Sequence, residues 1–426
     1  MNDCKMTNRV LGDAYFFHTL HDDKYKTEYL SFFFSLPLTS ANATSASLVA
    51  RILQRGCEKY PTMKDLSRAL DLNFAATVGA SAFKCGEREI FAVNLVSLKE
   101  QYALGNEKTF SNTLDILKNM LFCPLVEDGG FLDEYFESEK NNLRDSIRAQ
   151  INNKASYAKR RFIASMCENE PYAVNGEGDA DVLETLDRKG LYSFYREVIL
   201  NAECDVYYVG EKDSSEVEAL VGDFFGKRCV AALDKTLILS EAKEPKYVRE
   251  SMDIAQGHLF FGFRTGITYS SDNYLEAVLF NMILGGDVTS KMFMNLREKM
   301  SLCYSCHSML DASKGLLTAY AGIDPSNYEV CKSAFFEQLE NMREGKISKE
   351  ELDNAKNAYA NRMREIADNP SLLPMWYFLR RDDEGKRDPE RDARDIMKID
   401  VSAVVRAAKA VSLDTVYILS GEGTEE

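Results

Sequence analysis

The sequence predicts an α+β protein made of two homologous repeats, each a mostly antiparallel sheet packed against helices. Three observations lead to this prediction. Strand-like and helical runs succeed one another along the 426 residues, the order of the runs begins again at Gly257, and matching features keep a nearly constant spacing. A chain of this length can bury two substantial cores.

The first repeat opens with two β-rich runs, DAYFFHTLH and EYLSFFFSLPL, around a polar turn. We expect these runs to form a hairpin. A helix follows, because Leu48, Val49, Ile52 and Leu53 recur at helical spacing, and Gly56 stands where a C-cap would.

The rest of the first repeat continues in the same alternating manner. A second helix is expected in MKDLSRALDLNF, paired strands in FAATVGASAFK and REIFAVNLVSL, and further helices in NTLDILKNMLF and from Phe131 to about Cys167. LYSFYREVIL and the strand CDVYYVGE close the repeat.

The second repeat follows the same order as the first. GHLFFGFRT matches YLSFFFSLPL, and Phe260 lies 228 positions after Phe32. Its last helix should begin with a capping box of Ser348 and Glu351. Agreement in both order and spacing indicates a duplication. We therefore expect a first repeat at 1–226, a connector at 227–250 and a second repeat at 251–426.

Composition excludes some classes of function. The net charge of −15 gives no basic surface for nucleic acid. No apolar run is long enough for a transmembrane helix, and the amino-terminal residues have no secretory h-region. We expect a cytoplasmic protein with reduced thiols among its ten cysteines.

Two short patterns could have carried metal or redox chemistry. Cys303 and Cys306 form a C-x-x-C in a strand-like run, where positions i and i+3 point to opposite faces, so we favour a structural role for both. His18 and His21 diverge for the same reason, and His258 and His307 are isolated in the sequence. No metal site is expected from them.

One string in the second repeat, LGGDVTSKMFMNLREKMSLCYSCHSMLDASKGLLTAYAGIDPSNYE, resembles the carboxy-terminal half of the pitrilysin/insulinase (M16) zinc peptidases. RGCEKYP and NEPYAVNGEGDADVLETLDRKGLYSFYREVILNAECDVYYVGE resemble the first half of the same family. The resemblance covers nearly the whole chain. It implies the half-clamshell fold of these peptidases.

The resemblance also shows what is missing. Active members carry His-x-x-Glu-His on the first helix, where two His on one helical face bind zinc and the Glu activates water. The corresponding positions are Ser47, Ala50 and Arg51, and the third ligand corresponds to Glu137. The resemblance therefore implies a degenerate zinc site, no bound metal and no peptidase activity for the chain alone.

Arg297 and Tyr304 match the pair that the family places opposite the zinc to bind substrate. From spacing alone, a solvated Arg and a half-buried strand Tyr would be expected. The resemblance instead implies a substrate-facing pair, as in the non-catalytic subunit of heterodimeric M16 peptidases. The partner would then be a homologous subunit carrying His-x-x-Glu-His and zinc.

Two other functions stay open. The chain could be a structural or peptide-holding homodimer that kept the fold without catalysis. It could also be an adaptor in a peptide-maturation pathway that binds a peptide without cutting it.

Overall fold

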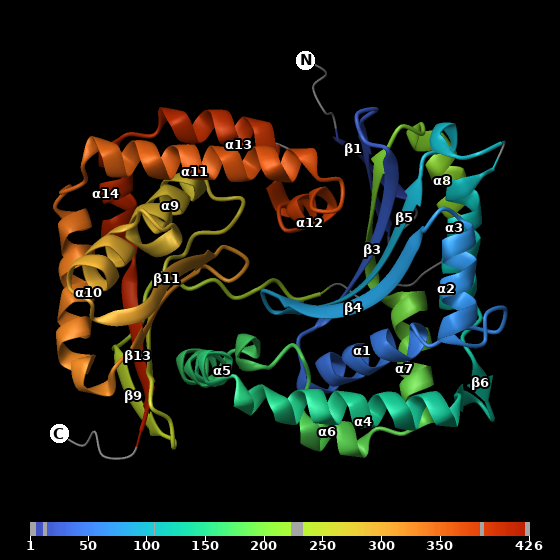
Figure 1. Ribbon diagram of the computed structural model, residues 1–426, viewed down its shortest axis with the longest axis horizontal. Coiled ribbons are helices and arrows are strands. Elements are labelled where there is room, and N and C mark those ends of the chain that lie inside the picture. The colour runs from blue at the N-terminus through green and yellow to red at the C-terminus, as the bar shows by residue number, and fades with distance from the viewer. Residues whose placement is uncertain (1–5, 12–14, 106, 223–232, 384–386, 422–426) are drawn as a thin grey trace. The chain divides into compact units, whose positions relative to one another are not determined.

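The computed structural model describes residues 6–11, 15–105, 107–222, 233–383 and 387–421. These residues form two compact units, each with its own sheet and helices (Figure 1). Unit 1 comprises Met1–Ala149, Val174–Lys235 and Asn369–Phe378, and unit 2 comprises Gln150–Ala173, Thr236–Asp368 and Leu379–Glu426. Each unit thus takes in a segment that lies, in sequence, within the other unit.

Unit 1 is built on a six-stranded sheet with the strand order β1-β2-β8-β3-β5-β4. The strands are β1 (Met6–Leu11), β2 (Tyr15–His21), β3 (Thr27–Pro37), β4 (Thr77–Cys85), β5 (Arg88–Leu98) and β8 (Glu203–Gly210). The longer helices of this unit are α1 (Ser40–Leu53), α2 (Met63–Leu72), α3 (Thr109–Phe122), α4 (Asp133–Ala149), α7 (Arg188–Asn201) and α8 (Ser214–Gly222).

The expected hairpin of residues 13–21 with residues 28–38 is wrong, because β8 lies between β2 and β3. β8 pairs in parallel with β2 and antiparallel with β3. Nearly every residue of β8 is buried, including Val206 and Tyr207 on its opposite faces. A strand that is apolar on both faces is most stable inside a sheet with both faces covered.

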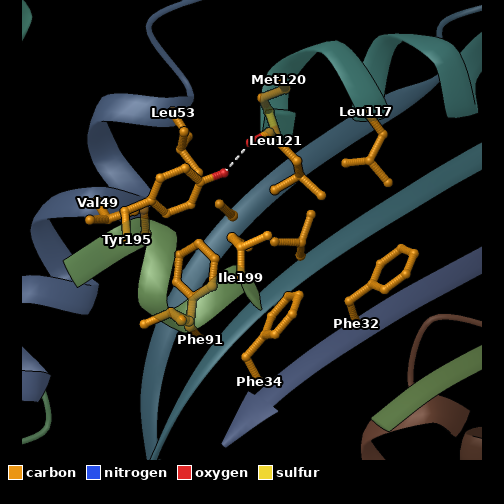
Figure 2. Packing of buried hydrophobic residues seen from close by; sticks show 14 of the residues in the cluster. Phe32, Phe34, Val49, Leu53, Phe91, Leu117, Met120, Leu121, Tyr195 and Ile199 are labelled. Atoms are coloured by element: carbon orange, nitrogen blue, oxygen red, sulfur yellow. Dashed lines mark hydrogen bonds between the residues drawn. The ribbon is translucent and has the colours of Figure 1, made fainter. Parts of the chain in front are cut away.

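One face of this sheet forms the core against the helices. Phe34 of β3 and Phe91 of β5 point toward Val49 of α1, Leu117 of α3 and Ile199 of α7 (Figure 2). All five are buried. The period-two pattern of the strands and the helical spacing of α1 therefore meet in one core, as the sequence predicts.

The opposite face of the sheet is covered at Phe33. Side chains alternate along a strand, so Phe33 points away from that core. Its ring packs on Phe378 of α12 (Leu373–Phe378), with centroids 4.5 Å apart, and on Tyr207 at 5.8 Å. The segment Asn369–Phe378 therefore belongs to unit 1 by its contacts.

The helix expected from Phe131 to Cys167 is broken. α4 ends at Ala149, and α5 (Lys154–Met166) begins after Asn153, whose side chain accepts a hydrogen bond from the Ser156 amide. An Asn at an N-cap favours a new helix start over a continuous helix. The break is also the point at which the chain passes from unit 1 to unit 2.

Unit 2 has a five-stranded sheet with the order β11-β12-β10-β13-β9. The strands are β9 (Lys246–Ser251), β10 (Gly257–Arg264), β11 (Cys303–Asp311), β12 (Leu316–Ile323) and β13 (Ser412–Ser420). Its helices include α9 (Tyr274–Asn281), α10 (Tyr328–Arg343), α11 (Lys349–Asp368), α13 (Pro389–Asp395) and α14 (Val401–Ala410). Part of the expected connector, 227–232, falls outside the described residues, and its last residues form the start of β9.

The two sheets confirm the duplication. The order β2-β8-β3-β5-β4 in unit 1 matches β9-β13-β10-β12-β11 in unit 2, and in each sheet the first pair of this order is parallel. Phe33 and Phe261 occupy equivalent strands, β3 and β10. β1 is the one strand of the larger sheet without a counterpart among the described residues.

α5 packs on the sheet of unit 2 at Gly262. A Cβ atom at this glycine would lie 2.5 Å from Sδ of Met166 and 2.7 Å from a ring carbon of Phe162. The absence of a side chain therefore allows the helix to approach β10 closely. Phe162 also stacks on Phe260, with centroids 5.2 Å apart.

The predicted start of α11 is confirmed. The Glu351 amide donates to Oγ of Ser348, and the Ser348 amide donates to Oε2 of Glu351 at 2.7 Å. Within the described ranges, no helix combines the length and the apolar character needed to cross a bilayer.

Candidate functional site

The helix that would carry a zinc motif, α1, has no metal-binding side chain at the relevant positions. Ser47 and Arg51 are half-buried, and Ala50 is buried. A hydroxyl, a methyl group and a guanidinium replace the two imidazoles and the carboxylate that the chemistry needs. The α1 positions therefore cannot hold zinc.

Glu137, the expected third ligand, lies on the exposed face of α4. Two residues later, Glu139 is buried and accepts a hydrogen bond at 3.0 Å from Arg55, just beyond the end of α1. Positions two apart on a helix point in nearly opposite directions. Glu139, and not Glu137, therefore faces the end of α1, where an arginine already neutralises it.

The histidines have structural partners. His18 is buried, stacks on Tyr207 with ring centroids 4.3 Å apart and contacts Oδ1 of Asp205 at 3.3 Å, while His21 is exposed. The expected divergence of His18 and His21 is confirmed.

His258 and His307, isolated in sequence, share a neighbour in space. Nδ1 of His258 lies 2.9 Å from the Tyr320 hydroxyl, and the His307 ring lies 5.2 Å from the same tyrosine. Burial lowers the pKa of both imidazoles, and the charge of Lys159 lowers that of His307 further. Both rings are therefore neutral near pH 7. Among the residues described, no three His, Cys, Asp or Glu side chains are grouped to hold a metal ion.

Arg297 lies near the end of a π-helical segment, η5 (Met292–Lys299). Its guanidinium packs over the ring of Phe293 at 4.5 Å and lies 3.7 Å from the Glu298 carboxylate, and the side chain is 42% exposed. A pair this open contributes little to stability. The N–H donors of Arg297 are therefore available to another molecule.

The chain turns sharply between Arg297 and Tyr304. Ser301 adopts a left-handed backbone with φ of +53°, which is uncommon for a residue other than glycine. The Leu302 amide donates to the Leu296 carbonyl at 2.8 Å and holds the turn. π-helical segments and strained residues of this kind gather at functional sites.

Tyr304 occupies a β-bulge at the start of β11. Cys303 pairs with Ile323 and Ser305 with Gly322, so Tyr304 has no residue opposite to it on β12. Tyr304 is 67% exposed, and its hydroxyl makes no hydrogen bond with the described residues. A half-buried strand tyrosine, expected from spacing alone, is therefore not what the structure has.

The same bulge corrects the expectation for the C-x-x-C. Cys303 lies opposite Ile323 and Cys306 opposite Ala321, two positions that share one face of β12. The extra residue turns the two cysteines to the same face, where each thiol shifts the pKa of the other.

Comparisons with known proteins agree with this geometry. Residues 185–359 match the model described as the peptidase M16 inactive domain. The chain is 30% identical over 406 residues to the "probable inactive metalloprotease YmfF" of Bacillus subtilis, with 95% of each chain covered. The chain belongs to the M16 peptidase family.

Solved structures show the same fold. A conserved protein from Enterococcus faecalis is 25% identical with a TM-score of 0.88, covering 99% of this chain and all of that one. A Pseudomonas fluorescens protein described as a peptidase M16 inactive domain is 16% identical with a TM-score of 0.77, covering 99% of each chain. The expected α+β fold of two repeats is confirmed.

As an M16 member, the chain is an inactive peptidase homologue. Its α1 residues at the zinc positions of the family cannot serve as zinc ligands. Ser47, Ala50 and Arg51 offer neither imidazole nor carboxylate, and Arg51 carries a positive charge. No catalytic step through a metal can be derived for this M16 chain.

Reasoning from sequence missed three features of this M16 homologue. These are the Glu139–Arg55 ion pair, the contact of His258 and His307 with Tyr320, and the facing thiols of Cys303 and Cys306. A buried carboxylate two residues from Glu137 could have been suspected from the helical period of α4. The other two depend on strand register, for which the sequence contains no signal.

Proposed function

We propose that this chain is the non-catalytic subunit of a two-chain M16 zinc peptidase, to which it contributes Arg297 and Tyr304 as substrate-binding residues. The observation that carries the proposal is an asymmetry. The zinc positions on α1 have lost every ligand, while Arg297 and Tyr304 keep their side chains exposed with donors available. A chain that had lost all use of this site would have no need of the strained turn at Ser301 and the bulge at Tyr304.

The chemistry of the two side chains suits this role. A guanidinium offers five N–H donors in a fixed plane, which suits the carbonyl oxygens of a bound peptide. A tyrosine hydroxyl can donate to the oxyanion of a tetrahedral intermediate, and one such donor contributes about 3 kcal/mol to stabilising the transition state. The zinc and its activated water would be those of the partner, a homologous subunit carrying His-x-x-Glu-His.

The test uses the purified chain mixed with a zinc-bearing M16 homologue and an unfolded peptide substrate. Tyr304→Phe is expected to lower kcat by roughly 100-fold to 1000-fold, since it removes one oxyanion donor. Arg297→Ala is expected mainly to raise KM, since it removes binding of the ground state. Metal content and complex formation should not change.

Matched controls separate these effects from general disturbance. Tyr247 is 63% exposed and Arg362 is exposed, so Tyr247→Phe and Arg362→Ala remove similar groups elsewhere. Both should leave activity unchanged. Full activity of the mixture with Arg297→Ala and Tyr304→Phe together would refute the shared site. A stable homodimer that binds peptide and ignores the zinc-bearing homologue would favour a peptide-holding protein or adaptor instead.

A further inference from the structure

The bulge at Tyr304 creates a pair of neighbouring thiols. In a regular strand, Cys303 and Cys306 would point to opposite faces. Here their partners on β12, Ile323 and Ala321, are two positions apart and share a face, so the cysteines share a face as well. A one-residue irregularity thus converts a C-x-x-C in a strand into a dithiol.

The two thiols are neighbours on this face and differ in exposure. Their pairing partners are two positions apart on β12, so no other residue of β11 stands between them on this face. Cys303 is 7% exposed, while Cys306 is half-buried and can be reached from solvent. A third thiol, Cys331 of α10, is fully buried.

The surroundings favour one thiolate. The neighbouring Cys306 side chain lowers the pKa of Cys303, and the positive charge of Arg297 lowers it further against the effect of burial. The Cys303 side chain and burial raise the pKa of Cys306. Burial raises the pKa of Cys331 to about 12. Cys303 is therefore the nucleophile of the three, because a thiolate attacks and a thiol does not.

We propose that Cys303 and Cys306 form a modification site, which a low-molecular-weight disulfide oxidises to an intrachain disulfide. The Cys303 thiolate attacks one sulfur of the small disulfide, whose S–S bond breaks and releases one thiolate. Cys306 gives its proton to that leaving thiolate and attacks Sγ of Cys303, and the second small group leaves as a thiolate, which takes up from water the proton that Cys303 released on ionising. The protein pair loses two electrons and two protons, and the small disulfide gains them as two thiols.

The bond would span Tyr304. Covalent closure across the bulge holds the backbone on both sides of this exposed tyrosine, so oxidation should change how Tyr304 meets a substrate. This consequence rests on the proposed function, whereas formation of the disulfide does not. The two are therefore tested by different measurements.

The full chain offers a clean assay. Trypsin releases Met300–Lys314, which contains Cys303 and Cys306 and no other cysteine, while Cys331 lies on Gly315–Lys332. The folded protein is treated with oxidised glutathione, denatured, alkylated and digested. Mass spectrometry should find Met300–Lys314 without alkyl groups and lighter by two hydrogen atoms, and reduction should restore two alkylation sites. The buried Cys204, on Glu197–Lys212, should be alkylated throughout.

Other outcomes overturn the proposal. Two alkyl groups on Met300–Lys314 after oxidation, or a cross-link from this peptide to Gly315–Lys332, would show that Cys303 and Cys306 do not form the pair. Cys306→Ser should instead trap glutathione on Cys303, because the resolving thiol is absent; a Cys303 that takes up no glutathione would contradict its assigned role. A disulfide that forms without altering the activity of the mixed peptidase would leave the modification site standing and remove only its link to Tyr304.

Discussion

Arg264 of β10 donates hydrogen bonds through both terminal nitrogens to the carboxylate of Glu170, at 2.7 and 3.0 Å. Glu170 lies just after α5, in the segment Gln150–Ala173, which belongs to unit 2. Nε of Arg264 also donates to Asp414 at 2.7 Å. Nζ of Lys314 contacts Oε2 of Glu170. All four side chains are nearly inaccessible to solvent.

Removal of Arg264 should destabilise unit 2 strongly. Arg264→Met leaves two buried carboxylates short of a cation, which costs about 3–5 kcal/mol. Urea unfolding followed by circular dichroism measures this loss. The exposed Arg196→Met is the matched control and should change the free energy of unfolding by less than about 0.5 kcal/mol. A similarly small change for Arg264→Met would show that the network does not hold the segment.

Glu89 should make stability fall with rising pH. Its carboxyl group is fully buried, neither oxygen has a hydrogen-bond partner among the described residues, and burial raises its pKa from 4.5 to about 8. Between these values the unfolded chain releases the proton and the folded chain keeps it, so stability declines by up to ~1.4 kcal/mol per pH unit. Below pH 4.5 both states hold the proton, so the group adds no further pH dependence.

Glu89→Gln should therefore gain stability relative to the unmodified chain as the pH rises from 4.5 to 8. Urea midpoints at several pH values measure the difference. The exposed Glu197→Gln should show no such trend. Parallel pH profiles for the Glu89 variant and the unmodified chain would mean that Glu89 is ionised in the folded protein.

Gly262 should tolerate no side chain. Gly262→Ala places a Cβ within 2.7 Å of Phe162 and Met166, and such overpacking destabilises by about 1–3 kcal/mol. Gly79→Ala is the matched strand control, because nothing lies within 4 Å of its Cβ position. Thermal unfolding should separate the two variants. Equal midpoints would indicate that α5 can move away from β10 without loss.

Zinc should not bind to the purified chain in stoichiometric amount. Elemental analysis after dialysis measures this, and one zinc per chain would contradict our account of α1. The combined substitution Ser47→His, Ala50→Glu and Arg51→His tests the site further. Because Glu137 lies on the exposed face of α4, two imidazoles alone should bind zinc weakly, and the metal should be lost on dialysis.

Much of the fold could be predicted from local patterns. Three features depend only on neighbours in sequence: the alternation of Phe32 and Phe33, the helical spacing of Leu48 to Leu53, and the capping box of Ser348 and Glu351. Strand partners do not. Paired positions of β2 and β8, such as Tyr15 and Cys204, are 189 residues apart, and Asn153 caps a new helix where periodicity alone would continue one helix.

The sequence by itself determined that zinc cannot bind on α1, because ligand chemistry depends on side-chain type and Ser47, Ala50 and Arg51 have the wrong types. It also determined the duplication. Only the tertiary structure decided that Tyr304 is exposed and that Cys303 faces Cys306. The physical reason is the bulge. One unpaired residue moves each following side chain to the face of the sheet opposite to the one that a period of two predicts, and the position of a bulge depends on the partner strand.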